Sequence, residues 1–376
     1  GDWEPTDKEQ YAFRCYEQHF GHDTSHVCDD IAKSIEKVPE HDFLVGGFPC
    51  QDYSVANSFA RGIEGKKGAL WWQIEKILSL HHPKYVLLEN VDGLLNSPTG
   101  QKGRDFSMIL RSFYQASYAV EWRVINAADY GQAQRRRRIF ILAYYRETDI
   151  FKELAENVCR GGSNAMHDFI IKSGVFASAF PVESKLGKRA GTFIDEMAFH
   201  SMADLSDSVR WNYANSGIMM NGMLYTEEVT PIIEKPIVLQ DILLSGAPSE
   251  YELLDSDMEK WKYLKGAKRE ERTNRYGRRF YFSEGAVPFP DVLTRPARTM
   301  LTSESSVSRS SHVVKDPETG VLRVLTPVEC ERLNGFPDNW TAGIPDKYRY
   351  FTMGNALVVP IVKRIGEALI AMLSSE

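Results

Sequence analysis

The sequence lacks any hydrophobic run long enough to cross a bilayer and any closely spaced pair of cysteines. Its longest apolar runs, such as residues 139–145, fall well short of the roughly 20 residues that a membrane-spanning helix needs. Its five cysteines lie far apart and form no Cys-x-x-Cys pair, which argues against a disulfide framework and against a metal site. The first residues have the pattern of neither a secretory leader nor a transit peptide. These absences predict a soluble protein of the reducing cytoplasm, with no membrane contact and no metal.

The chain does have enough apolar residues for a packed core, and its charge is strongly polarised. A length of 376 residues suits about two domains, and a hydrophobic fraction of 43% is enough for a packed core. The net charge is −6, but residues 1–50 hold eleven acidic and four basic side chains, whereas residues 260–279 hold nine basic ones. Such a block is usually a solvated surface. The aromatic residues Tyr263, Tyr276 and Phe280 in and beside it favour a nucleic-acid contact as the alternative.

Short apolar runs alternate with helical patterns in the first 150 residues. The runs have the length of buried strands, and the apolar positions between them recur at helical spacing. This alternation predicts an α/β fold with a parallel sheet covered on both faces. The strands are expected at residues 43–45, 85–88 and 139–144, and the helices at 70–80 and 106–117.

Beyond the third strand the regular alternation ends, which predicts a second and more irregular domain. Capping boxes at Thr6 and Thr326 mark two helix starts, and Gly21 is expected to end the first of these helices. A broad apolar face over residues 357–373 predicts a last helix that packs on the first domain. The expected division is a catalytic domain over 1–150, a second domain over 151–325, and returning helices over 326–376.

One cysteine follows the first predicted strand, at the position where open parallel sheets bind their ligands. Residues 46–51 read Gly-Gly-Phe-Pro-Cys-Gln and lead into a polar loop. Ligands bind outside the carboxyl ends of such strands, so Cys50 is expected at the mouth of a crevice. A lone cysteine is more often a small core residue, but Pro49 and the polar sequence after Cys50 argue against that reading.

The other two predicted strands bring charged side chains toward the same region. Glu89 ends the second strand within the sequence Glu-Asn-Val, where a carboxylate needs either a partner or a catalytic task. A structural ion pair is the alternative. The third strand is entered through Gln-Arg-Arg-Arg-Arg at 134–138, and strand alternation predicts that Arg136 and Arg138 point to one face. Each of these signals is weak by itself.

Together, the blocks resemble the 5-methylcytosine DNA methyltransferase family. Five of them occur in the family's order and at similar spacing, namely Phe-Pro-Cys-Gln, Glu-Asn-Val, Gln-Arg-Arg-Arg-Arg, Thr-Pro-Val-Glu-Cys-Glu-Arg-Leu-Asn-Gly-Phe-Pro and the final Gly-Asn-Ala. The resemblance covers about residues 1–148 and 294–376, and leaves out the middle, where the family's target-recognition domain varies. It implies a doubly wound, Rossmann-like methyltransferase sheet and a smaller recognition domain over 151–325.

The resemblance also implies a role for each charged or nucleophilic residue. Carbon 5 of cytosine is a poor nucleophile until a thiolate adds at carbon 6, and Cys50 would supply that thiolate. By family analogy, Glu89 bonds to the Watson–Crick edge of the base and helps to protonate its ring nitrogen. Arg138, with Arg136, would hold the base carbonyl and the loop. The target base would have to be flipped out of the duplex to reach these groups.

S-adenosylmethionine is the cofactor that the resemblance implies. The pair Asp2-Trp3 resembles the family's residues for the ribose hydroxyls and the adenine ring, and the pair Asp30-Ile31 resembles those for the adenine amino group. The remaining cofactor-binding positions implied by the family are Pro49, Leu70, Asn355 and Ala356. The family's opening strand and Phe-x-Gly-x-Gly turn have no counterpart in the sequence. We expect residues upstream of Gly1 to carry them; a split enzyme and a degenerate member are the alternatives.

Double-stranded DNA is the partner that the resemblance implies. The loop at 52–69 resembles the family's closing lid, with Lys67 placed to meet a phosphate and Ser54 near the flipped nucleotide. The predicted DNA-binding residues are Gln51, Ser54, Lys67, Arg275, Arg278, Arg279 and Arg309. The basic block at 260–279 belongs to the expected recognition surface.

The leading interpretation is a sequence-specific bacterial DNA cytosine methyltransferase of a restriction-modification system. We expect it to act as a monomer and to share that system with a cognate restriction endonuclease. A transfer-RNA cytosine methyltransferase of the same family is the first alternative, and the long recognition region disfavours it. A non-catalytic or split DNA-binding subunit is the second alternative.

Overall fold

The chain forms two compact units in a computed structural model that describes residues 9–48, 69–97, 102–194, 211–273 and 277–374. The first, here called the sheet unit, comprises Asp29–Asn126, Arg137–Ile232 and Lys363–Glu376. The second, here called the hairpin unit, comprises Gly1–Cys28, Ala127–Arg136 and Ile233–Val362. Each unit is therefore assembled from segments far apart in the sequence.

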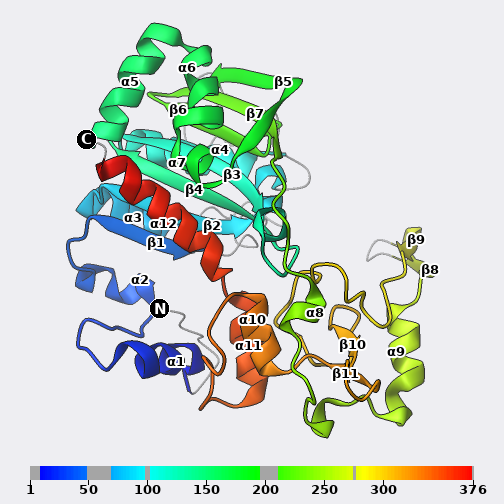
Figure 1. Cartoon of the computed structure of the whole chain (residues 1–376). Coiled ribbons are helices and arrows are strands. Elements are labelled where there is room, and N and C mark those ends of the chain that lie inside the picture. Colours follow the sequence, from blue (N-terminus) through cyan, green and yellow to red (C-terminus); the bar gives the residue numbers. More distant parts are fainter. Residues whose placement is uncertain (1–8, 49–68, 98–101, 195–210, 274–276, 375–376) are drawn as a thin grey trace. The chain divides into compact units, whose positions relative to one another are not determined.

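The sheet unit is built on a seven-stranded mixed sheet with the order β1-β2-β4-β3-β6-β7-β5 (Figure 1). Strands β1 and β2 are parallel, and every other neighbouring pair is antiparallel. The strands are β1 (Phe43–Gly47), β2 (Tyr85–Val91), β3 (Tyr118–Asn126), β4 (Arg137–Tyr145), β5 (Val182–Phe193), β6 (Ser216–Met220) and β7 (Met223–Pro231). The α/β fold class is confirmed, but the sheet is not parallel throughout.

The antiparallel pairs follow from connections without a crossover helix. Strands β6 and β7 are joined by Asn221 and Gly222, both with positive φ, which is the two-residue turn of a tight hairpin. Strands β3 and β4 are joined by ten residues, Ala127–Arg136, with one short 3-10 turn at Ala127–Tyr130. A parallel connection needs a longer crossover, usually through a helix, so both pairs reverse direction.

The helices of the sheet unit match the sequence prediction where it was made. Helix α3 (Ala69–His81) and helix α4 (Arg104–Gln115) cover the two predicted spans to within a few residues. Trp71 of α3 and Phe113 of α4 are buried against β-strand residues such as Val86 and Trp122 in one apolar core. The other helices are α2 (Ile31–Ser34), α5 (Asp149–Gly161), α6 (Ser163–Asp168), α7 (Val175–Ala179) and the last helix α12 (Val359–Ser374), which begins in the hairpin unit.

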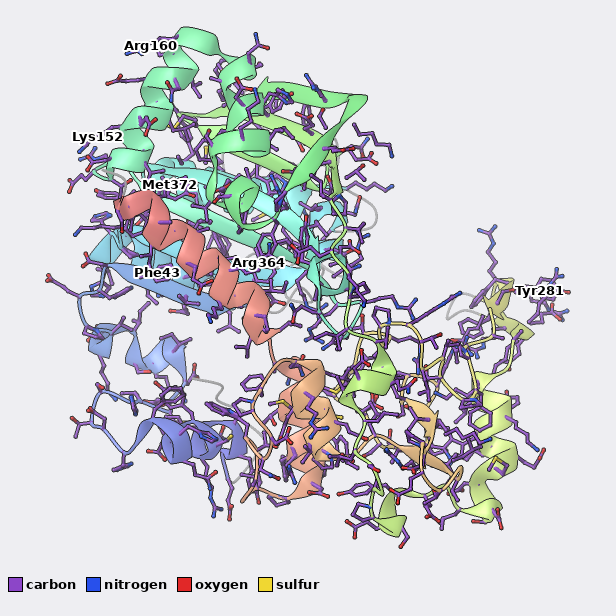
Figure 2. The ribbon with its side chains drawn as sticks, viewed as in Figure 1. Phe43, Lys152, Arg160, Tyr281, Arg364 and Met372 are labelled. Carbon is purple, nitrogen blue, oxygen red and sulfur yellow. The ribbon has the colours of Figure 1, made fainter. Side chains whose placement is uncertain are left out.

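Strand β1 differs from the prediction of a buried strand. Its residues alternate between exposed and half-buried, with Phe43 40% and Val45 51% exposed (Figure 2). Among the described residues, β1 is hydrogen-bonded to β2 on one side only. A strand at a sheet edge has fewer neighbours to cover it, which explains the exposure. The other two predicted strands are buried as expected, because both lie inside the sheet.

The hairpin unit contains short helices and two small antiparallel sheets. Its elements are α1 (Tyr11–Phe20), α8 (Leu239–Ile242), α9 (Met258–Lys265), α10 (Pro327–Leu333) and α11 (Asp346–Asn355), with the strand pairs β8 (Lys268–Thr273) and β9 (Arg279–Glu284), and β10 (Val313–Lys315) and β11 (Leu322–Val324). The capping box at Thr326 is confirmed: its side chain accepts from the Glu329 amide at 3.2 Å, and Glu329 accepts from the Thr326 amide at 2.7 Å. Gly21 ends α1 with φ of 80°, as predicted. The predicted start after Thr6 is wrong, because α1 begins at Tyr11 with Gln10 as its N-cap; Thr6 itself lies outside the described residues.

No helix in the described ranges combines the length and the apolar character that a bilayer crossing requires.

Candidate active site

Glu89 and Arg138 form an ion pair at the carboxyl end of β2. The Arg138 Nε lies 2.8 Å from the Glu89 Oε1, and their side chains are 16% and 19% exposed. In the ladder between β2 and β4, Glu89 is opposite Phe140 and Val91 is opposite Arg138. Glu89 and Arg138 are therefore diagonal neighbours on one face of the sheet, within reach of long side chains. Strand pairing therefore brings together two residues that are 49 positions apart in the sequence.

Asn90 fastens the chain immediately before the Pro49-Cys50 segment. It is 3% exposed, and its Nδ2 donates to the backbone carbonyl of Phe48 at 2.6 Å. Gly47 lies beside Glu89 in the parallel ladder, and a Cβ at Gly47 would come within 3.3 Å of the Glu89 Oε2. A glycine here leaves space for the carboxylate. Cys50 and Pro49 lie outside the described residues, so their roles stay predictions.

Arg136 belongs to the hairpin unit and holds two backbone segments of that unit together. It is 4% exposed, and it donates to the carbonyls of Met300 at 3.1 Å and Gly354 at 3.0 Å. A Cβ at Gly354 would lie 2.4 Å from the Thr302 amide nitrogen, so only glycine fits between the two segments. Arg136 thereby fixes the end of α11, of which Asn355 is the last residue and Ala356 the C-cap.

Only Arg137 and Arg138 of the four arginines at 135–138 lie in a strand, so the predicted alternation of side-chain directions applies only to these two. Strand β4 begins at Arg137, so the strict two-residue period does not extend back to Arg136. Arg137 is 61% exposed and pairs with Asp92 at 2.9 Å, while Arg138 turns to the Glu89 face. The expectation that Arg136 and Arg138 share one strand face is therefore corrected, because Arg136 precedes the strand.

The described cofactor candidates of the sheet unit lie at two helix starts. Asp30 is the N-cap of α2, where its Oδ1 accepts from the Ala32 amide at 3.0 Å. Ile31, at the first position of α2, is half-buried, and Leu70, at the start of α3, is 37% exposed. Helices α2 and α3 are in contact. A carboxylate with spare acceptor capacity beside apolar side chains suits an adenine-like ring with an amino group.

The described DNA-binding candidates lie in the hairpin unit. Arg278 and Arg279 are exposed at the start of β9, and Arg279 lies 3.5 Å from Glu271. Arg309 is partly buried and donates to the carbonyls of Leu264 at 2.9 Å and Gly266 at 3.0 Å. The predicted residues that fall outside the described residues are Asp2, Trp3, Gln51, Ser54, Lys67 and Arg275.

Two buried amides were not singled out from the sequence. Gln134 is fully buried, with its Nε2 donating to the Leu333 carbonyl and to Asn334, and its Oε1 accepting from the Met300 amide. Asn90 ties down Phe48 in the same manner. A buried side-chain amide must find hydrogen-bond partners. The positions of Asn90 next to Glu89 and of Gln134 close to Arg136 could therefore have indicated that these two amides position the site.

A model of the C-5 cytosine-specific DNA methylase family matches residues 5–371. Among curated proteins, the type II methyltransferase M.Sau3AI of Staphylococcus aureus is 48% identical over 374 residues, covering 98% of this chain and 87% of that protein. The type II methyltransferase M.NlaIV of Neisseria lactamica is 27% identical, covering 91% of this chain and 86% of the relative.

Solved structures show similarity in fold. The Entamoeba histolytica methyltransferase EhMeth superposes with a TM-score of 0.54 at 14% identity, covering 98% of this chain and 89% of that one. The S. pombe Dnmt2 methyltransferase gives 0.53 at 13% identity, covering 98% and 90%.

Proposed function

Because the chain belongs to the C-5 cytosine-specific DNA methylase family, we propose that it methylates carbon 5 of a flipped-out cytosine in double-stranded DNA through a covalent Cys50 adduct. It is a DNA cytosine methyltransferase of the type II restriction-modification kind. One observation carries the finer proposal: the Glu89–Arg138 pair lies beside Asn90, which anchors the backbone one residue before Pro49-Cys50.

The chain's own residues supply addition, protonation and elimination. The Cys50 thiolate attacks carbon 6 of the cytosine, and the carbon 5–carbon 6 electron pair moves to the carbon 4–carbon 5 bond. The ring nitrogen beside carbon 4 then takes a proton from the carboxylic acid form of Glu89. The resulting enamine carbon 5 takes the methyl group. Loss of the carbon 5 proton to a base then restores the carbon 5–carbon 6 double bond and expels the Cys50 thiolate, and the ring nitrogen returns its proton to Glu89. Arg138 holds the Glu89 carboxylate at 2.8 Å, which orients it toward the base edge.

S-adenosylmethionine, when bound, supplies the electrophilic methyl group of this reaction. Asp30 offers an acceptor for its adenine amino group, and Ile31 and Leu70 offer apolar contact. Asp2, Trp3 and Pro49 are further proposed contacts of the cofactor. Leu70 and Asn355 are proposed for the methionine part, and Ala356 is a further proposed contact beside Asn355. Arg136 supports the last two by holding the Gly354 carbonyl.

The proposal extends to the setting of the enzyme. Residues 151–325 would recognise the target, and residues 1–150 with 326–376 would carry the chemistry. The enzyme would act as a monomer on DNA in the bacterial cytoplasm, in a system that includes a cognate endonuclease.

A mechanism-based trap tests the proposed function. Duplex DNA carrying 5-fluorocytosine at the methylated position is incubated with the protein and S-adenosylmethionine. A fluorine at carbon 5 cannot leave as a proton, so a stable adduct on Cys50 is expected by peptide mass spectrometry. Bisulfite sequencing of unmodified DNA should report 5-methylcytosine at one sequence. Labelled methyl transfer to transfer RNA but not to DNA would favour the alternative substrate, and labelled methyl transfer without any adduct would overturn the covalent step.

A further inference from the structure

The β8–β9 hairpin presents two chemically different faces. Residues directly opposite one another share a face, and alternate residues along each strand point to opposite faces. One face, here called the covered face, consists of Lys268, Glu270, Arg272, Phe280, Phe282 and Glu284. The other, here called the open face, consists of Arg269, Glu271, Thr273, Arg279, Tyr281 and Ser283.

Charges on the covered face already have partners within the unit. The Tyr263 hydroxyl, from α9, donates to Glu270 at 2.9 Å, and the Tyr263 ring lies 4.2 Å from the Lys268 ammonium. Arg272 is 2.9 Å from Glu270, and its guanidinium lies 3.7 Å from the Phe282 ring centroid. The part of this face at Lys268 and Glu270 therefore packs against Tyr263 of α9, whereas Arg272 and Phe280, nearer the turn, are exposed.

The open face is exposed at all six positions. Tyr281, opposite Glu271 in the middle of the ladder, is 63% exposed and is labelled beside the hairpin in Figure 2, with the Arg269 guanidinium 4.9 Å from its ring centroid. Arg279 and Glu271 form a surface ion pair at 3.5 Å, with side chains 77% and 47% exposed. Such pairs are worth little in water, so both groups can exchange partners on binding.

The base of the hairpin is tied down from both sides. Arg309 donates to the Gly266 carbonyl before β8, and also to the Gly285 carbonyl after β9. The buried Lys265 ammonium donates in turn to the Arg309 carbonyl at 3.0 Å and to the Ser311 carbonyl. A ribbon held at its base pays little further ordering cost when it binds.

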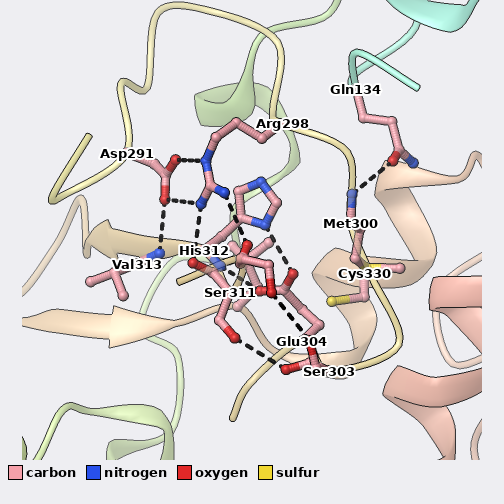
Figure 3. A network of polar contacts seen from close by, with 12 residues as sticks. Gln134, Asp291, Arg298, Met300, Ser303, Glu304, Ser311, His312, Val313 and Cys330 are labelled. Carbon is pink, nitrogen blue, oxygen red and sulfur yellow. Dashed lines mark hydrogen bonds and ion pairs between the residues drawn. The ribbon is translucent and has the colours of Figure 1, made fainter. Parts of the chain in front are cut away.

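The segment that carries Arg309 is itself anchored by a buried polar network (Figure 3). Arg298 pairs with Asp291 at 2.8 Å and donates to the Ser311 carbonyl at 3.0 Å. His312 and Glu304, both fully buried, are joined at 3.0 Å. The segment that holds the base of the hairpin is therefore itself held by buried polar contacts.

We propose that the open face of the β8–β9 hairpin enters the major groove of double-stranded DNA and reads base edges there, an inference that rests on the proposed function. A two-stranded ribbon fits the major groove, which is about 12 Å wide. Arginine suits guanine, glutamate suits the amino group of cytosine, and an aromatic ring suits the methyl group of thymine. Arg269, Glu271 and Tyr281 supply these three chemistries on one face.

Face-matched substitutions in the full-length protein test the proposal. The probe is a pool of duplexes with randomised sequence, and the readout is the sequence of the duplexes retained by the protein, which requires no catalysis. Arg269→Ala and Tyr281→Ala are compared with Arg272→Ala, which removes the same charge as Arg269→Ala but from the covered face. Arg269→Lys keeps the charge and loses the paired donors, so it separates base reading from phosphate attraction.

Open-face substitutions should lower the preference for one or two base positions by roughly five- to a hundred-fold. Arg269→Lys should lose preference while keeping the salt dependence of binding, and Arg272→Ala should leave the preferred sequence unchanged. Equal loss of affinity in all arginine variants, with an unchanged preferred sequence, would overturn the inference. Selective binding by a protein that makes no 5-methylcytosine would instead count against the proposed function and leave the hairpin assignment standing.

Discussion

Glu89 and Arg138 owe their contact to strand pairing rather than to their places in the sequence. The sequence indicated that Glu89 needed a partner or a task, and left open which of the two applied. Pairing between β2 and β4 supplies the partner at 2.8 Å while leaving both side chains partly exposed. A partly exposed ion pair retains access to a ligand, so it fits the proposed role of Glu89 better than a fully buried pair would.

Replacing Cys50 with Ser should abolish methyl transfer and leave DNA affinity within a few fold, because the hydroxyl is a far weaker nucleophile than the thiolate. The measurement is methyl incorporation together with a binding titration on the same DNA. Cys159→Ser is the matched control, since Cys159 is an exposed free cysteine on α5. Retained turnover in Cys50→Ser would remove Cys50 as the nucleophile.

Replacing Asn90 with Ala should lower kcat at least ten-fold with little change in DNA affinity. The substitution leaves the Phe48 carbonyl without its 2.6 Å donor and loosens the segment before Cys50. Loss of one buried hydrogen bond should also cost about 1–3 kcal/mol of stability. The exposed Asn157→Ala on α5 is the control. Unchanged single-turnover methylation would show that Asn90 does not position the proposed nucleophile.

Among the elements, β3 joins the sheet to the segment that follows α6 through a buried acid. The Glu121 Oε1 accepts from the Val175 amide at 3.2 Å and from the Tyr144 hydroxyl. Burial raises the pKa of Glu121 to about 7, against the lowering effect of the Tyr144 hydrogen bond. Arg123, on the same strand, donates to the Phe176 carbonyl at 3.1 Å. The sequence analysis predicted no strand at these residues, and the partners of the acid come from β4 and from the segment around Val175.

Stability should fall with rising pH because of Glu121. Its pKa in the folded protein lies above the usual 4.5, so the folded state holds a proton that the unfolded chain releases. The stabilisation is complete below about pH 4.5 and is lost as pH rises through 7, on the order of 3 kcal/mol in all. Thermal unfolding at pH 5.5 and 8.5 should show a larger loss for the wild type than for Glu121→Gln. The exposed Glu156→Gln should behave like the wild type; a Glu121→Gln variant with the wild-type pH dependence would refute the assignment.

Local signals predicted the elements well where one side chain decides the outcome. The capping box set the start of α10, and Gly21 ended α1, because both depend on neighbouring residues only. The burial of β1 was predicted wrongly, because exposure depends on which strands lie beside it. The parallel direction predicted for the strands was also wrong, because the short connections before β4 and β7 reverse the chain and make those pairs antiparallel.

At the scale of the whole molecule, the net charge is negative although one segment of the chain is strongly basic. The net charge is −6, yet residues 260–279 hold nine basic side chains. The structure distributes those described over α9 and two hairpin faces, with some paired inside the unit and others exposed. A local excess of positive charge is sufficient to attract a polyanion even when the sum is negative.

Neutralising Arg275, Arg278 and Arg279 together should weaken DNA binding and flatten its salt dependence. Each lost phosphate contact lowers the slope of log affinity against log salt by about 0.9. Binding titrations at several salt concentrations measure that slope. Neutralising the exposed Lys152, Arg160 and Lys172 removes the same charge from the sheet unit and serves as the control. Equal slopes for the two triple variants would mean that the basic block is only a solvated surface.

The sequence by itself determined the family, the order of the chemical blocks, the end of α1 and the start of α10, because these depend on residue types at fixed spacing. The tertiary structure decided which charges meet: Glu89 with Arg138, Arg136 with the Gly354 carbonyl, and Arg309 with both ends of the hairpin. It also decided that β4 runs against β2 and that one hairpin face stays open. Such contacts join segments tens to hundreds of residues apart. Strand register and packing fix their geometry, and local sequence patterns predict neither of these.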